Sequence, residues 1–396
     1  MSTTLRIATR FLLARKRSML MSLAGISFGV AFFVLTQAQT AGFERFFIRT
    51  ILGADGALRV ADRLRSGDSG KYVEGVQYPA ELKSAILAYP EVTAAAEVIK
   101  GSATLDSALS RNEVQIFGVT PGEFASVSAL RTQIVAGSLD AFHRSSSGVL
   151  LGAELARRSN IRPGDSVTLL RGSQIRRFRV AGLFETGIGD IDRVRLILHA
   201  GETRALLERP FGCSYIQVAL ADPSRAEALA RRMEANLGHA VAPWQRREKV
   251  WLDAFRVLRV SSALTVLTIV LVSALGMYNT LAMLVLEKTR EIAILRSMGF
   301  TRRDIAAVFL WLGAIVLTLG SLAGAALGAA LTLGVERLPL RVRGIFSTDH
   351  FVVEWDPLHY LAAFVCAAVV VMFASLLPAR RAARLEPGDV IRGTAS

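Results

Sequence analysis

Four long stretches of this chain contain no lysine, arginine, aspartate or glutamate, although charged residues make up 20% of its 396 positions. A bilayer core takes about 20 apolar residues per helix, and a charge at its centre costs about 2.5–3.5 kcal/mol on insertion scales. The pattern therefore predicts an α-helical membrane protein rather than an ordinary soluble one. Its four transmembrane helices are expected at residues 19–40, 260–286, 305–335 and 357–378.

The first stretch has an alternative interpretation as a cleaved signal peptide, because Arg15, Lys16 and Arg17 precede it. Its apolar run is longer than the roughly 7–15 residues usual for a signal peptide, and the sequence around Ala38 makes a poor cleavage site. We therefore expect a retained transmembrane helix.

The basic residues are distributed in a way that predicts the orientation of the four helices. Residues 1–18 hold five basic and no acidic residues, and the connector 287–304 holds five basic ones. Residues 336–356 hold only three basic residues against four acidic ones. Because short cytoplasmic segments are rich in lysine and arginine, both termini (1–18 and 379–396) and the connector are expected in the cytoplasm.

The same distribution bears on the net charge of +14, which by itself would be compatible with nucleic-acid binding. The large segment 41–259 holds 30 basic residues against 24 acidic ones, which is typical of a generally solvated surface. No nucleic-acid partner is expected. This segment and the loop 336–356 are expected on the outer side of the membrane.

A large α+β extracytoplasmic domain is expected between the first and second transmembrane helices, over residues 56–245. Helical stalks at 41–55 and 246–259 are expected to join it to the membrane. Strands are predicted at 56–60, 92–99, 113–119, 166–170 and 178–183, and helices at 79–88, 150–159, 201–207 and 223–237. We expect two subdomains that meet near residues 121–148.

The connector 287–304 predicts a short amphipathic helix of about 11 residues at the cytoplasmic face. Ile292, Leu295 and Met298 recur at helical spacing, with Ile294 beside Met298. Opposite charges at i, i+3 are expected to pair, as in Lys288–Glu291 and Glu287–Arg290. Gly299 predicts the C-terminal stop, and Thr301 with Asp304 predicts a capping box for the next helix.

The string EKTREIAILRSMGFTRRDI in this connector resembles the cytoplasmic coupling segment of ABC-transporter permeases of the cell-division/macrolide-exporter/lipoprotein-release superfamily. Three further strings are most similar to transmembrane subunits of lipoprotein-releasing systems: GVAFFVLTQAQTAGFERFFIRTILG, VLLGAELARRSNIRPGDSVTLL and FRVAGLFETGIGDID. The closing string LPARRAARLEPGDVIRG fits the wider superfamily. The resemblance implies a protein of the bacterial inner membrane.

It also implies that the connector helix docks on a separate ATPase subunit, present in two copies, which binds the ATP and Mg²⁺. The expected contact and geometry residues are Glu287, Arg290, Glu291, Leu295 and Gly299. Further expected partners are a second permease subunit, identical or homologous, a periplasmic acceptor or adaptor, and lipid or lipoprotein cargo. An alternative function within the superfamily is to relay ATP-driven movement to an extracytoplasmic enzyme. An alternative for the connector is an interfacial helix with no partner.

The chain itself shows no catalytic, metal or cofactor site. The pair Gly70-Lys71 lacks the rest of a phosphate-binding loop, because Arg65 and Tyr72 stand where glycine and serine or threonine are required. The five histidines have no ligand spacing with one another or with cysteine. Cys213 is expected outside and Cys366 inside the membrane, so they are not expected to pair.

Glycines at four-residue spacing predict close helix packing within the membrane. They are Gly25 and Gly29 in the first helix, and Gly320, Gly324 and Gly328 in the third. Two interpretations remain open: a seam against another subunit, or fixed packing inside one four-helix unit.

Overall fold

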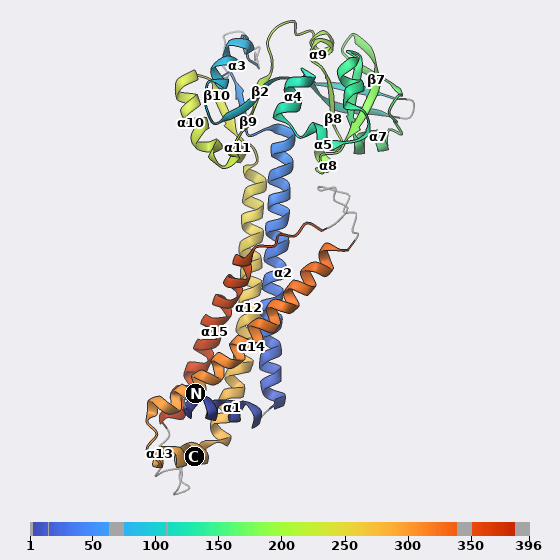
Figure 1. The fold of residues 1–396 in the computed structure, drawn as a ribbon. Helices are drawn as coiled ribbons and strands as arrows, with labels where there is room; N and C mark the ends of the chain where they lie inside the picture. The colour runs from blue at the N-terminus through green and yellow to red at the C-terminus, as the bar shows by residue number, and fades with distance from the viewer. Residues whose placement is uncertain (1–2, 15, 63–74, 108–109, 339–350, 385–396) are drawn as a thin grey trace. The chain divides into compact units, whose positions relative to one another are not determined.

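A computed structural model describes residues 3–14, 16–62, 75–107, 110–338 and 351–384 (Figure 1). Gly70 and Lys71, most of the loop 336–356 and the tail beyond residue 384 lie outside these described residues. The described part of the chain divides into two compact units, one made of its residues up to 43, 254–338 and 351–384, and the other made of its residues within 44–253. We describe each unit by itself.

Within the described residues, the first unit contains four helices that are long and apolar enough to cross a membrane, as predicted. They are α2 (Lys16–Asp55), α12 (Lys249–Glu287), α14 (Arg302–Glu336) and α15 (Pro357–Arg384), where the outer ends of α2 and α12 belong to the second unit. A core of buried apolar side chains joins them, including Val34, Met277, Phe309, Leu312 and Val371. Hydroxyls add links between helices: Ser18 lies 3.0 Å from Thr280, and Ser27 donates to the carbonyl of Gly320 at 3.0 Å.

The first unit also contains two short helices, α1 (Thr3–Ala14) and α13 (Thr289–Ser297), at the same end of the long helices (Figure 1). Residues 1–18 are predicted from the sequence to lie in the cytoplasm, with no secondary structure assigned to them. Helix α1 forms because Ala8 and Phe11 bury an apolar face, and the ring of Phe11 lies 6.4 Å from that of Phe309 on α14. Burial against the long helices thus stabilises a helix that would be marginal alone.

In the part of the second unit that the structure describes, an α+β domain is built on one ten-stranded sheet with the order β10-β1-β9-β2-β3-β8-β5-β7-β4, in which β6 pairs with β2 and β7. The strands are β1 (Leu58–Ala61), β2 (Val92–Asp106), β3 (Arg111–Val119), β4 (Ile134–Gly137), β5 (Gly148–Gly152), β6 (Ser166–Arg171), β7 (Gln174–Phe184), β8 (Arg195–His199), β9 (Tyr215–Leu220) and β10 (Ala240–Pro243). Most neighbours are antiparallel, whereas β3–β8 and β5–β7 are parallel.

Helices of the second unit cover this sheet and fill its connections. They are α3 (Pro79–Leu87), α4 (Pro121–Val127), α5 (Leu130–Gln133), α6 (Leu139–Arg144), α7 (Ala153–Arg158), α8 (Gly189–Asp192), α9 (Ala200–Leu207), η1 (Pro223–Arg225), α10 (Ala226–Leu237) and α11 (Trp244–Arg247). Residues 121–148 supply α4, α5, β4 and α6, and strands from both sides of this segment join the same sheet.

The helix predicted at 150–159 is wrong in its first part. Strand β5 (Gly148–Gly152) occupies that part, and α7 begins only at Ala153. All five residues of β5 are buried, and a continuous apolar run is typical of a strand covered on both faces. Gly152 allows a close approach, since a Cβ there would lie 2.2 Å from the carbonyl oxygen of Asp192.

The C-terminal end of α2 and the N-terminal end of α12 both belong to the second unit and pack against each other there. The ring of Phe47 on α2 lies 5.4 Å from that of Trp251 on α12, which is the spacing of a packed aromatic pair. The two helix ends therefore hold each other where they reach the sheet.

Candidate functional site

The connector between α12 and α14 folds into α13, whose end is closed at Gly299. The φ angle of Gly299 is +96°, which lies in the left-handed region that favours glycine. The amide of Gly299 donates to the carbonyl of Arg296 at 3.2 Å, and the amide of Phe300 donates to the carbonyl of Leu295 at 3.2 Å. These bonds satisfy carbonyls that have no partner inside the helix. The predicted stop is present.

The predicted capping box that opens α14 is also present. The side chain of Thr301 accepts from the amide of Asp304 at 3.2 Å, and the Asp304 carboxylate accepts from the amide of Thr301 at 2.9 Å. With one defined end at Gly299 and another at Thr301, the turn between α13 and α14 has a fixed direction.

The inner face of α13 packs against the membrane helices. Ile292 and Ala293 are buried, and Leu295 is half-buried against the same apolar core that contains Leu284 and Phe309. Leu295, which was expected to contact an ATPase, thus packs against the core formed by the long helices.

The outer face of α13 carries charged and apolar side chains together. Arg290 and Glu291 are exposed, as are Glu287 at the end of α12 and Gly299 just after α13. Ile294 and Met298 are also exposed, at 49% and 74% of their surface. The single apolar face expected from the spacing is therefore wrong, because Ile292 and Leu295 point inward whereas Ile294 and Met298 point outward.

Polar contacts tie α13 to its neighbours. Lys288 pairs with Glu291, as predicted, and its ammonium lies 5.9 Å from the centre of the Phe11 ring on α1. Arg296 donates to the carbonyl of Ala383 on α15 at 3.4 Å. The helix is thus held by α1 and α15 as well as by the two long helices that it joins.

The glycines of α2 lie against α12. A Cβ on Gly25 would lie 3.2 Å from the hydroxyl of Ser273, and one on Gly29 would lie 3.3 Å from a methyl of Val270. The hydroxyl of Ser273 also donates to the carbonyl of Gly25 at 3.0 Å. Close contact of the two backbones makes this bond possible.

The glycines of α14 lie against α2. A Cβ on Gly320 would lie 3.0 Å from Ile26, one on Gly324 would lie 2.6 Å from the carbonyl oxygen of Ser27, and one on Gly328 would lie 3.2 Å from Ala31. All five glycines therefore pack inside the four-helix unit of one chain.

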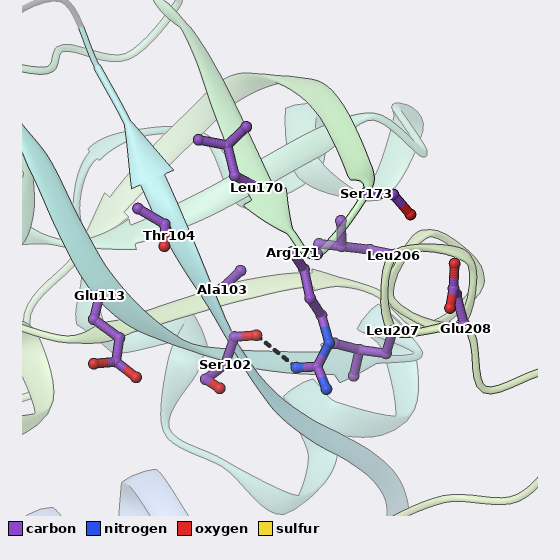
Figure 2. A pocket seen from close by; sticks show the side chains of 11 residues that line it. Ser102, Ala103, Thr104, Glu113, Leu170, Arg171, Ser173, Leu206, Leu207 and Glu208 are labelled. Atoms are coloured by element: carbon purple, nitrogen blue, oxygen red, sulfur yellow. Dashed lines mark hydrogen bonds between the residues drawn. The ribbon is translucent and has the colours of Figure 1, made fainter.

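The second unit contains a cavity of about 610 Å³ between β2, the β6–β7 turn and the end of α9 (Figure 2). Arg171 crosses one side of it and donates to the carbonyl of Ser102 at 2.6 Å. Glu113 and Glu208 also line it, without a histidine or cysteine that could act as a base or nucleophile. Across the described residues, no group of three or more histidine, cysteine, aspartate or glutamate side chains could hold a metal ion.

Two protein-family models match this chain, one over most of α2 and of the second unit, and one over the other three long helices. The model described as "MacB-like periplasmic core domain" matches residues 19–236, more than half of the chain, and the "FtsX-like permease C-terminal" model matches residues 263–387. The chain belongs to the FtsX-like permeases that carry a MacB-like periplasmic core domain. The second match contains all of α13, α14 and α15 and most of α12, so the connector helix lies in the permease part.

Individual relatives match this permease over nearly all of its length or over about half of it. It is 26% identical to the lipoprotein-releasing system transmembrane protein LolC of Xylella fastidiosa, over 98% of both chains. It is 23% identical to the transmembrane protein LolE of the same system in Haemophilus influenzae, over 99% of both chains. It is 30% identical to the macrolide export ATP-binding/permease protein MacB of Psychrobacter arcticus, over 47% of this chain and 28% of that one. The chain is a permease subunit of an ABC transporter, a class in which ATP hydrolysis resides in a partner subunit or domain.

Sequence reasoning about this permease missed two features of the connector. It did not single out Ile294 and Met298 as surface residues, because periodicity shows that a face is apolar but not which core it meets. It also assigned Arg296 no contact, although its long side chain reaches the end of α15. The basic residues of the predicted cytoplasmic N-terminus gave no indication of the apolar face that forms α1.

Proposed function

We propose that this permease couples ATP hydrolysis by a partner ABC ATPase to movement of its periplasmic domain, and thereby releases lipoprotein or other amphiphilic cargo from the bacterial inner membrane. The observation that carries the proposal is the outer face of α13. Ile294 and Met298 expose apolar surface beside Arg290 and Glu291 on a helix that is otherwise anchored. Burial of such a pair contributes affinity, and the charges around it set the register of docking.

The anchoring of α13 explains how a push from the ATPase would be passed on. Ile292 and Ala293 fix the helix to the membrane core, and Arg296 fixes it to α15. A displacement of α13 therefore has to displace α12 and α14, which continue from its two ends. ATP and Mg²⁺ bind to the partner, and this chain binds no cofactor itself.

Two observations support an amphiphilic cargo. The relatives LolC and LolE are named for lipoprotein release, and their alignments cover nearly all of this chain. In addition, a cavity of about 450 Å³ between α12 and α15 is lined almost entirely by apolar groups, among them Leu271, Leu275, Val369 and Phe373. Such a surface accepts acyl chains at little cost, whereas it offers nothing to a charged solute.

The proposed assembly contains two ATPase subunits and a second permease, identical or homologous. Both termini and α13 lie in the cytoplasm, where the ATPase is, and the MacB-like domain lies in the periplasm and delivers cargo to an acceptor or adaptor. The opposite basic content of the connector and of residues 336–356 supports this orientation.

The coupling role is tested with the variant Ile294→Ser/Met298→Ser, co-expressed with the partner ABC ATPase. Loss of two central apolar contacts is expected to weaken ATPase binding by about 10- to 100-fold. Co-purification of the two subunits and ATP hydrolysis in vesicles are the measurements. Met283→Ser is the matched control, since Met283 is a 45%-exposed methionine of α12 outside the connector.

Wild-type assembly and hydrolysis in the double variant would show that α13 is not the docking helix. A second variant, Glu291→Ala/Leu295→Ala, tests the residues expected from the sequence. We expect Leu295 to affect stability and Glu291 to affect ATPase binding.

Cargo release is measured separately, as ATP-dependent transfer of a fluorescent diacylglyceryl lipopeptide from vesicles to albumin. Hydrolysis without transfer would favour signalling over release.

A further inference from the structure

The last residue of helix α2 lies in the second unit and carries a buried carboxylate. This residue is Asp55, which is only 7% exposed. Its two oxygens contact two arginines: Oδ2 lies 2.8 Å from Arg59 at the start of β1, and Oδ1 lies 2.9 Å from Arg195 at the start of β8. Arg59 is a neighbour in sequence, whereas Arg195 comes from a distant part of the chain.

Further contacts hold these arginines in place. The guanidinium of Arg195 lies 4.1 Å from the centre of the Phe117 ring, and that of Arg59 lies 4.7 Å from the centre of the Tyr215 ring. Arg247 ends α11, just before α12, and donates to the carbonyl of Gly56 at 2.9 Å. The ends of both long helices therefore meet the sheet at one charged cluster.

Asp55 is ionised in this cluster at neutral pH. Burial alone would raise the pKa of its carboxyl, but the positive charges of Arg195, Arg59 and Arg247 outweigh burial and lower that pKa to about 2. Separation of Asp55 from Arg195 would leave both charges in a buried site with incomplete pairing, which is strongly unfavourable. The two side chains are thus constrained to move together.

The strand order shows why this constraint matters. Strand β1 continues directly from α2, so the chain itself carries a movement of α2 to that part of the sheet. Strand β8 is separated from β1 by β9, β2 and β3. The Asp55–Arg195 ion pair bypasses these three strands and connects the end of α2 directly to β8.

We infer that the Asp55–Arg195 ion pair is the joint through which movement of α2 reaches one half of the periplasmic domain, the half that contains β8, β5, β7 and β4. Arg195 is in this sense a positioning residue for transport. The inference rests on the proposed function, because it assumes that ATP binding moves α2. Loss of the joint should uncouple hydrolysis from movement of that half of the domain without preventing assembly.

The test uses the full complex in vesicles, with the native cysteines replaced and spin labels attached through Arg49→Cys on α2 and Ser146→Cys before β5, both at exposed positions. In the otherwise unchanged complex, the distance between labels is expected to change upon ATP binding. With Arg195→Gln, assembly and ATP hydrolysis should stay within about twofold, whereas the distance change is lost and lipopeptide transfer falls by about tenfold or more. Arg176→Gln is the matched control, since Arg176 forms a 2.9 Å ion pair with Glu202 nearer the surface of the same domain.

An unaltered distance change and transfer in Arg195→Gln would overturn the inference. If that variant fails to assemble, Arg195→Lys replaces it, because lysine keeps the charge but loses the planar fork that fits a carboxylate. The joint then predicts a reduced distance change with assembly intact, and a change like that of the parent contradicts it. If the parent complex itself shows no ATP-dependent transfer, the proposed function fails instead of the joint.

Discussion

At the scale of single residues, the buried carboxylate of Asp192 organises the loop before β8. Only 1% of Asp192 is exposed. It accepts hydrogen bonds from the amide and the hydroxyl of Thr186 at 2.9 and 2.7 Å, and from the amide of Gly187 at 3.2 Å. Burial raises the pKa of this carboxyl even though these bonds oppose the shift. The side chain therefore stabilises the loop mainly as an acceptor for donors that have no access to water.

Replacement of Asp192 by alanine should leave these donors buried without an acceptor. Unsatisfied donors of this kind cost about 1–3 kcal/mol each, so we expect a loss of about 3 kcal/mol in the free energy of unfolding. Thermal unfolding of the purified permease in detergent measures the loss.

The matched control is Asp190→Ala in the same loop. The Asp190 side chain is 64% exposed and forms a 2.7 Å ion pair with Arg193, so its loss should change stability by only about 0–1 kcal/mol. Equal effects of the two substitutions would contradict the assigned role of Asp192.

At the scale of elements, packing of α2 on α14 depends on the absence of side chains on α14. A Cβ on Gly324 would lie 2.6 Å from the carbonyl oxygen of Ser27 and 2.8 Å from the Cβ of Val30. Neither group can rotate away, because one belongs to the backbone and the other is attached to it directly. The two helices must therefore separate if Gly324 gains a side chain.

Gly324→Ala is expected to destabilise the membrane unit by about 1–3 kcal/mol, the usual cost of overpacking. Gly334→Ala in the same helix is the control, since a Cβ there meets nothing within 4 Å. Without a clash, alanine at position 334 should be neutral or slightly stabilising. Thermal aggregation in lipid nanodiscs distinguishes the two, and similar midpoints would show that the helices are not in close contact at Gly324.

At the scale of the whole molecule, the basic residues near the ends of the four helices predict the orientation of these helices. Five basic residues in the connector 287–304 and five in residues 1–18 predict that both segments remain in the cytoplasm. The large domain between α2 and α12 must then lie on the opposite side of the inner membrane.

This orientation is tested by labelling single cysteines in a variant that lacks the native ones. We expect Ser126→Cys, at an exposed position of α4, to react with an impermeant maleimide in spheroplasts. Ser297→Cys, at an exposed position of α13, should react only after the membrane is permeabilised. The reverse pattern would place the connector outside and exclude contact with a cytoplasmic ATPase.

The sequence by itself determined those features that depend on composition or on a few adjacent residues. Four charge-free stretches predicted the four long helices, because hydrocarbon excludes charge over a known length. Gly299, Thr301 and Asp304 predicted the ends of α13 and α14, because helix caps are local interactions.

Only the tertiary structure decided which partner each side chain meets. Periodicity grouped Ile292 with Met298, but the position of the membrane core buried the first and exposed the second. The pairing of Asp55 with Arg195 depends on the order of the strands, which local pattern does not determine. Contacts between residues far apart in the chain arise from how the elements pack together, and this packing is a property of the whole fold.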